Sequence, residues 1–249
     1  WPTFSILGRI RRSQGADLSA REFIEKHGYR GRARVLAEMV LTAHLPGSID
    51  EIGVAGLVDD GVLTLETGLN HRVVEGYDRL PAFIAEGLDV RKGFVVEKVG
   101  WDGDGVSVTS RDGFEVSARA GVTTMPVGVL RSRSVGFEPE LPESKRAALE
   151  CMGMGPVVKV LLRFKERFWP RWLSTLGCGV GPVTLYWPVF YGAVAENEPV
   201  PSAYATGPRA RALSAMSEEE AANVALADLA RLFPHAEPGR YLVDSRCID

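Results

Sequence analysis

The sequence predicts a fold of mixed α/β and α+β type, arranged as two interleaved domains. Apolar residues recur at helical spacing over residues 18–45, whereas short β-branched runs separated by turn signals fill residues 90–124. A mixed region of strands and helix follows from residue 144 onward. Because helices come first, strands second and a mixture last, the order differs from a regular alternation of strand and helix.

The helices are predicted from apolar spacing and from end signals. They cover residues 18–45, as two helices joined at 28–31, and residues 78–86, 144–151 and 217–232. Ser217 is expected to cap the last helix, because three glutamates follow it where carboxylates favour the positive end of the helix dipole. Residues 48–70 are expected to be loops with one short strand near 62–65.

The strands are predicted from β-branched runs bounded by turn residues. They cover residues 94–99, 105–109, 114–117, 122–124, 157–164, 184–187 and 203–206. Aspartate and glycine at 102–105 and 111–113 supply tight hairpin turns between the first three runs. We therefore expect a three-stranded meander that leads into a fourth strand at 122–124.

Composition narrows the class of partner. A chain of 249 residues with 45% apolar residues can bury a real core, and 29 basic against 32 acidic residues gives no electrostatic reason to expect nucleic acid or an acidic membrane as partner. Cys151, Cys178 and Cys247 are widely spaced without a C-x-x-C pair, so no metal site is predicted and a reducing, cytoplasmic location is favoured. No apolar run approaches the roughly 18 residues that cross a bilayer, so a soluble chain is expected.

One ordered series of short motifs is more specific than any of these patterns. It contains Gly76-Tyr77-Asp78-Arg79-Leu80, Phe94-Val95-Val96-Glu97-Lys98-Val99, Gly105-Val106-Ser107-Val108, Asp112-Gly113, Thr124-Met125-Pro126-Val127-Gly128-Val129-Leu130, Phe137-Glu138-Pro139-Glu140-Leu141-Pro142, Gly153-Met154-Gly155, Lys159-Val160 and Phe168-Trp169. This series resembles the FAD-dependent amine oxidases, the superfamily of monoamine oxidases, polyamine oxidases and flavin-type histone lysine demethylases. The resemblance is close over residues 73–170 and looser on either side.

The resemblance implies a partial Rossmann-like FAD-binding domain interleaved with a mixed sheet-plus-helix substrate domain. Residues 1–72 and 136–235 would belong to the substrate domain, and residues 73–135 and 236–249 to the FAD-binding domain. The implied reaction is oxidation of a carbon–nitrogen bond with FAD as cofactor, a small-molecule amine as substrate and dioxygen as final acceptor. The product is an imine, and hydrogen peroxide is released.

Cofactor contacts come from the resemblance position by position. Val96 resembles the valine whose backbone meets the adenine end of FAD, although the pattern alone fits an ordinary core position in a strand. Thr124, Met125 and Pro126 resemble the turn at the end of a strand that approaches the flavin. A plain turn from strand to helix explains that proline equally well.

Lys159 is the residue expected to take part in the chemistry. It resembles the family's lysine that holds a water against the reactive nitrogen of the flavin. From the residues alone the interpretation would differ, because Lys159 alternates in phase with Arg163 and Lys165 and could share a solvated strand face.

Aromatic and acidic residues are the candidates for substrate contacts. Trp187 and Tyr191 could line an amine pocket, because aromatic faces attract ammonium groups. Glu196 and Glu198 could favour a polyamine, although exposed loop carboxylates are usually only solvated. Phe168-Trp169 matches the family too, but such a pair is more often core than cofactor wall.

The sequence also departs from the family. It has no G-x-G-x-x-G loop to receive the FAD pyrophosphate, and Cys247 stands where the family commonly has tryptophan, so either the alignment slips there or one aromatic wall of the flavin site is altered. Both ends read as cuts, so we interpret the chain as an internal fragment. The full-length protein is expected to be active, and this piece alone to bind FAD poorly.

Two alternatives remain open at this point. A related flavoprotein acting on a non-amine, such as a protoporphyrinogen oxidase or carotenoid desaturase, would share the FAD scaffold but usually lacks the spacing from Gly153-Met154-Gly155 to Lys159. A degenerate relative that serves as an interaction module would not be catalytic, and the missing FAD segments and Cys247 would fit it.

Overall fold

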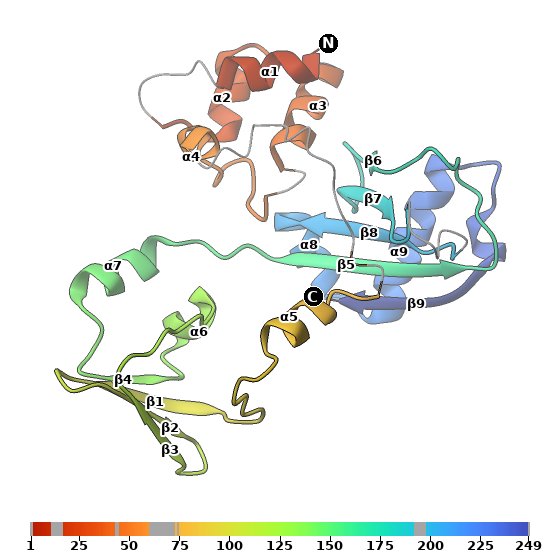
Figure 1. The fold of residues 1–249 in the computed structure, drawn as a ribbon. Helices are drawn as coiled ribbons and strands as arrows, with labels where there is room; N and C mark the ends of the chain where they lie inside the picture. The colour runs from red at the N-terminus through yellow and green to blue at the C-terminus, as the bar shows by residue number, and fades with distance from the viewer. Residues whose placement is uncertain are drawn as a thin grey trace. The chain divides into compact units, whose positions relative to one another are not determined.

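The computed structural model describes residues 2–10, 17–42, 45–59, 73, 75–191 and 198–248. The chain divides into two compact units, which are described separately (Figure 1). The large unit comprises Trp1–Val74 and Gly155–Asp249, and the small unit comprises Glu75–Met154. The expected mixture of helices and strands is confirmed, and the strands form two sheets. The assignment of segments to an FAD-binding and a substrate domain stays a prediction.

The first part of the large unit is helical. Its helices are α1 (Pro2–Ile10), α2 (Ala20–Lys26), α3 (Gly31–Thr42) and α4 (Val54–Asp59). Ile6, Ile10, Phe23, Ile24 and Leu41 are almost completely buried and form their common core. The predicted pair of helices around residues 28–31 is confirmed. Helix α4 lies where only loops were expected, and the strand expected at 62–65 lies outside the described residues.

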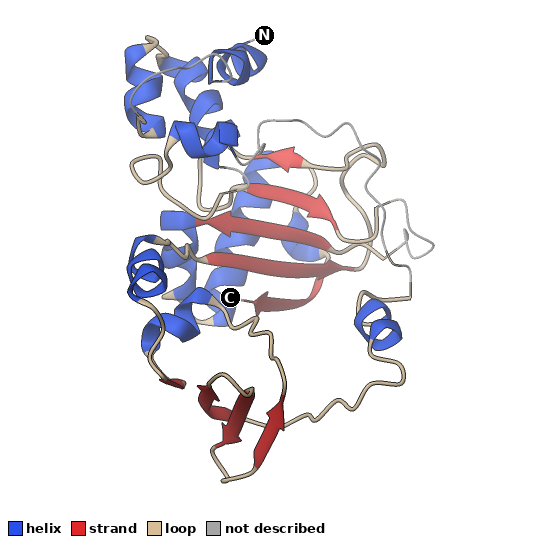
Figure 2. Cartoon of the chain, turned by 60° about the vertical axis from the view of Figure 1, so that its left-hand side comes forward, coloured by secondary structure: helices blue, strands red, loops and turns tan. Residues whose placement is uncertain are grey.

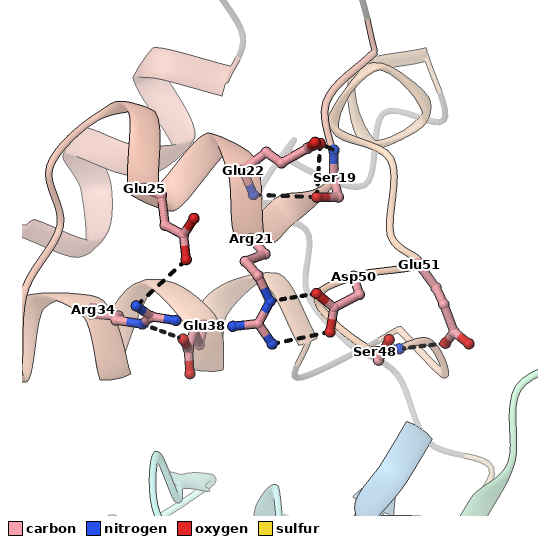
Figure 3. A network of polar contacts seen from close by, with 9 residues as sticks. All are labelled: Ser19, Arg21, Glu22, Glu25, Arg34, Glu38, Ser48, Asp50 and Glu51. Carbon is pink, nitrogen blue, oxygen red and sulfur yellow. Dashed lines mark hydrogen bonds and ion pairs between the residues drawn. The ribbon is translucent and has the colours of Figure 1, made fainter.

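A network of polar contacts ties α2 to the segment that follows α3 (Figure 3). The Arg21 guanidinium binds both carboxylate oxygens of Asp50, and Arg34 pairs with Glu38 at 2.8 Å. The hydrogen bond from Arg21 lowers the pKa of the Asp50 carboxyl. Because these ion pairs are exposed, they contribute more to the local arrangement than to stability.

The second part of the large unit is a five-stranded sheet in the order β6-β7-β8-β5-β9, in which all neighbours are antiparallel. Its strands and helices are β5 (Val157–Phe164), β6 (Leu176–Gly177), β7 (Leu185–Pro188), β8 (Pro201–Thr206), α8 (Gly207–Ser214), α9 (Glu218–Leu232), the short 3-10 helix η1 (Pro238–Arg240) and β9 (Leu242–Ile248). Strand β5 has the predicted bounds, and β7, β8 and α9 are confirmed within a few residues.

Helices α8 and α9 cover one face of this sheet (Figure 2). Val158, Val160, Leu162 and Phe164 alternate along β5 and point into that covered face, where each is at most 2% exposed. Burial of an apolar side chain of this size stabilises the fold by about 1.5–3 kcal/mol. Strand β5 therefore has one face committed to the core and one face directed away from the helices.

The small unit contains a four-stranded sheet in the order β3-β2-β1-β4 and three short helices. Its elements are α5 (Arg79–Ile84), β1 (Val96–Trp101), β2 (Val106–Ser110), β3 (Glu115–Ala118), α6 (Val127–Ser132), β4 (Gly136–Glu138) and α7 (Glu143–Cys151). The predicted meander and the two predicted helices, α5 and α7, are confirmed.

The predicted fourth strand at 122–124 is wrong. Those residues are not part of a strand, and the fourth strand is β4, which pairs in parallel with β1. Val122 is 92% exposed. Its β-branched neighbours favour extended backbone locally, but within the small unit as described no ladder forms with them, and a strand requires a partner.

Ser217 caps α9 as predicted, and the cap has a testable energetic consequence. Ser217 Oγ accepts a hydrogen bond from the Glu220 amide at 3.3 Å, and the Glu220 carboxylate accepts one from the Ser217 amide at 2.8 Å. We predict that Ser217→Ala lowers the free energy of unfolding at pH 7 by about 1 kcal/mol in urea titrations. Ser214→Ala, an exposed change at the end of α8, should have little effect.

The same cap should depend on pH. Hydrogen bonds from Ser217 lower the pKa of the Glu220 carboxyl below its ordinary value of 4.5. Stabilisation of this kind is complete above the ordinary pKa and is lost as pH falls through the lowered one. The difference between Ser217→Ala and the unsubstituted protein should therefore narrow on acidification, and a constant difference would contradict the role of the carboxylate.

Candidate functional site

Of the residues expected to carry chemistry in the large unit, Lys159 and Trp187 lie on the sheet face that points away from α8 and α9. Lys159 and Leu161 alternate with the buried residues of β5, so they point to this second face, which we call the Lys159 face. Register places Tyr204 of β8 directly beside Lys159, and Ile248 of β9 on its other side. The Lys159 side chain is exposed.

An aromatic pair lies beside Lys159 on that face. Trp187 of β7 and Tyr204 of β8 have ring centroids 5.2 Å apart with an interplanar angle of 51°. Both side chains are half-buried, and burial raises the pKa of the Tyr204 hydroxyl, so the phenol stays neutral near pH 7. Lys159 thus lies beside Tyr204, whose ring packs against Trp187, and such aromatic faces can receive an alkyl ammonium group.

The sequence-predicted substrate residues have different positions. Trp187 lies on the Lys159 face, whereas Tyr191 lies in the turn after β7, where its amide donates to the Pro188 carbonyl at 3.4 Å. Glu198 is exposed, and Glu196 lies outside the described residues. Tyr204 was not identified from the sequence, because only the β5–β8 register places it beside Lys159.

Two other motif positions face the core. Trp169 is 6% exposed and packs with Phe164 and Phe168 on the helix-covered side of the sheet. Cys247 pairs with Val160 and packs against the same core, and its amide donates to Glu218 Oε1 at 2.7 Å. The position at which an aromatic flavin wall was considered therefore points to the helices and not to the Lys159 face.

The predicted cofactor residues of the small unit lie at a strand start and at a helix start. Val96 is the first residue of β1, and the Val95 carbonyl accepts a hydrogen bond from the Arg111 amide on the β2 side. The pairing of β1 with β2 is irregular between Val96 and Lys98. The pairing with β4 begins only at Lys98.

Thr124, Met125 and Pro126 form the extended entry to α6, and Pro126 is the N-cap residue of that helix. The prediction that the proline precedes a helix is confirmed. Their role in cofactor binding stays a prediction, as do those of Val96 and Lys159, because Lys159 belongs to the large unit and each unit is described by itself.

Comparison with known proteins identifies the class. A model of the flavin containing amine oxidoreductase family matches residues 12–245, so the chain belongs to this family. Polyamine oxidase 4 of Oryza sativa subsp. japonica is 35% identical over 205 residues, which cover 82% of this chain and 41% of that protein. Polyamine oxidase 2 of Arabidopsis thaliana is 37% identical over 174 residues, which cover 69% of this chain and 35% of that protein.

Solved structures agree at the level of the fold. Wild-type putrescine oxidase bound to putrescine superposes with a TM-score of 0.80 at 19% identity, over 99% of this chain and 61% of that one. At this identity the similarity concerns the fold alone. The chain spans about two fifths or less of the length of the two plant relatives, at 41% and 35%.

The residues present fit part of the cofactor that the family name implies. A backbone edge such as that of Val96 offers one donor and one acceptor, which is the complement that an adenine ring requires. Lys159 offers a single flexible ammonium or amine group on an accessible face. The sequence holds no G-x-G-x-x-G loop of the kind that receives a pyrophosphate.

Among the helices of the described segments, none is long and apolar enough to cross a membrane.

Proposed function

We propose that the complete protein is an FAD-dependent amine oxidase that converts a small aliphatic amine to an imine, with dioxygen as electron acceptor and release of hydrogen peroxide. The observation that carries this proposal is the placement of Lys159 beside Tyr204, whose ring packs against Trp187, on one face of the five-stranded sheet. Membership in the flavin containing amine oxidoreductase family supports it.

Each of the proposed site residues would have a separate role. When bound, FAD supplies the acceptor for the two electrons removed from the carbon–nitrogen bond. The Val96 backbone edge would hold the adenine, and Thr124, Met125 and Pro126 would line the approach to the flavin. Lys159 would hold a water by hydrogen bonding, so that a proton can move at the reacting nitrogen without long-range reorganisation.

The aromatic pair would select the substrate. An alkyl ammonium ion is attracted to the face of Trp187 or Tyr204, and its hydrocarbon part is desolvated against the rings. The amine must lose its proton before oxidation, and the water that Lys159 would hold could take part in moving that proton. The arrangement therefore favours substrates with an amine on a flexible alkyl chain, and the plant relatives named polyamine oxidases support this class.

The experiment that tests the proposal is hydrogen peroxide release by the complete, FAD-loaded protein. The panel contains putrescine, spermidine, spermine, benzylamine and a dimethyl-lysine peptide, with a porphyrinogen and a carotenoid as non-amine substrates. We expect peroxide with at least one alkyl amine and none with the non-amines. Turnover of a non-amine alone would assign the protein to another branch of flavoproteins, and no turnover of any compound would favour a non-catalytic relative.

Trp187→Ala tests the aromatic pair in the same assay. We predict that KM for the preferred amine rises about tenfold, because a cation–aromatic contact in a partly desolvated site contributes on the order of 1–2 kcal/mol. The value of kcat should change less than twofold. Trp172→Ala is the matched control, since Trp172 is 75% exposed in the same unit. An equal rise in KM for the two variants would contradict a role of Trp187 in the substrate site.

A further inference from the structure

A buried polar network lies beneath β7, on the helix-covered side of the sheet. The Tyr186 hydroxyl lies 3.0 Å from the Ala225 carbonyl and 3.3 Å from Asp228 Oδ2, both on α9. The Asp228 side chain is 1% exposed, and its other oxygen binds the Arg231 guanidinium. The network therefore joins β7 to α9.

The same network also contacts the loop between β6 and β7. Arg231 donates to the Val180 carbonyl at 3.2 Å. Gly181 in this loop has φ +114°, and a Cβ there would lie 2.5 Å from Arg231 Nη2 and 2.8 Å from Asp228 Oδ1. Only glycine combines that backbone conformation with so close an approach to the ion pair.

A second arginine holds the start of this loop. Arg209 of α8 donates to the Cys178 and Gly179 carbonyls at 3.3 and 3.1 Å. Strand β7 is therefore attached to the helices in two places. Tyr186 contacts α9 on the helix-covered face, and the loop before β7 accepts hydrogen bonds from arginines of both α8 and α9.

Such a network is costly for stability alone. Burial raises the pKa of the Asp228 carboxyl and of the Tyr186 hydroxyl. The Asp228 side chain is 1% exposed whereas that of its partner Arg231 is 57% exposed, so the carboxylate is withdrawn from water without a fully buried partner. The alternative use of a buried polar network is to fix one arrangement among several of similar energy.

The network bears on the next residue of β7, Trp187. Tyr186 and Trp187 are consecutive in β7, so their side chains point to opposite faces of the sheet. A rotation or slide of β7 that displaced the Tyr186 hydroxyl would move Trp187 relative to Tyr204 by a similar amount. The hydrogen bonds of Tyr186 therefore act on the position of Trp187 together with the pairing of β7 and β8.

We propose that Asp228 is a positioning residue which, through the Tyr186 hydroxyl, sets the place of Trp187 on the Lys159 face and so tunes amine binding. The link to amine binding rests on the proposed function. The link from Asp228 to Trp187 does not, because it concerns contacts within the large unit alone.

The test uses Tyr186→Phe, which removes one hydroxyl, and Asp228→Asn, which keeps the shape of the side chain and removes its charge. In the complete protein, the fluorescence of Trp187 is isolated as the difference between each background and the same background with Trp187→Phe. KM and kcat for the preferred amine, and the unfolding temperature, are measured on the same samples. Glu237→Gln is the matched control, because it breaks an exposed ion pair with Arg240, also at i,i+3 spacing.

We expect both network variants to shift the Trp187 emission to longer wavelength and to raise KM about fivefold, with kcat changed less than twofold. Glu237→Gln should leave all three unchanged. Folded Tyr186→Phe with an unshifted Trp187 emission would overturn the proposal, even if the unfolding temperature fell, because the network would then act on stability only.

Failure of the proposed function gives a different pattern. If the unsubstituted protein oxidised no amine while Tyr186→Phe still shifted the Trp187 emission, the assignment as an amine oxidase would fall and the positioning of Trp187 by the network would stand. If the emission shifted but KM did not change in an active enzyme, the proposed link between Trp187 position and amine binding would be wrong. Should Asp228→Asn not fold, Asp228→Ser takes its place, because Tyr186→Phe also removes the contact with the Ala225 carbonyl and does not isolate Asp228.

Discussion

Lys159→Met is expected to lower kcat/KM for amine oxidation by the complete protein by about 100-fold or more. The substitution removes the nitrogen that we propose holds a water, whereas the methionine keeps an apolar stem of similar length. Among the described residues, Lys159 makes no ion pair or hydrogen bond through its side chain. Removing it should therefore cost little stability, and the loss of activity should reflect chemistry.

The measurement is steady-state peroxide release, accompanied by anaerobic reduction of the enzyme with amine and reoxidation with dioxygen. These two half-reactions show which step depends on Lys159. Lys165→Met is the matched control, because Lys165 is exposed just past the end of β5 and follows Lys159 in the same alternation. If the two variants behaved alike, the simpler interpretation of Lys159 as part of a solvated strand face would be correct.

The local features of the fold could be predicted from the sequence because their causes are local. Alternation of Val158, Val160 and Leu162 with Lys159 predicts a strand with one buried face, and β5 has that form. Ser217 with its following glutamates predicts the start of α9, where a capping box is present. Aspartate and glycine at the hairpin turns predicted the meander of the small unit.

What the sequence did not predict depends on pairing between distant segments. Tyr204 gained its place beside Lys159 only through the register of β8 on β5, which no periodicity in either strand specifies. The same reason explains why the fourth strand of the small unit was predicted wrongly. The short β4 pairs with β1 although β2, β3 and α6 lie between them in the sequence, and the β-branched residues at 122–124 do not pair. The outward or inward direction of Cys247 likewise followed from its pairing with Val160.

The two faces of β5 lead to a second prediction, which concerns the stability of the fold. Leu162 is completely buried against the core beneath α8 and α9, whereas its neighbour Leu161 is half-buried on the Lys159 face. We predict that Leu162→Ala lowers the free energy of unfolding by about 3 kcal/mol, because it removes buried methyl groups and leaves a cavity that close packing cannot fill. The measurement is urea unfolding at constant pH, followed by circular dichroism.

Leu161→Ala is the control that the strand itself offers, since it makes the same chemical change one residue away on the other face. It should cost about 1 kcal/mol or less, in proportion to the smaller apolar area that it withdraws from contact. The ratio between the two losses therefore reports the direction of every side chain in β5, because a shift of the strand by one residue would exchange the faces. Equal losses, or a larger loss for Leu161→Ala, would contradict this assignment of the two faces. Lys159 would then not share a face with the aromatic pair, and the proposed amine site on the Lys159 face would be wrong.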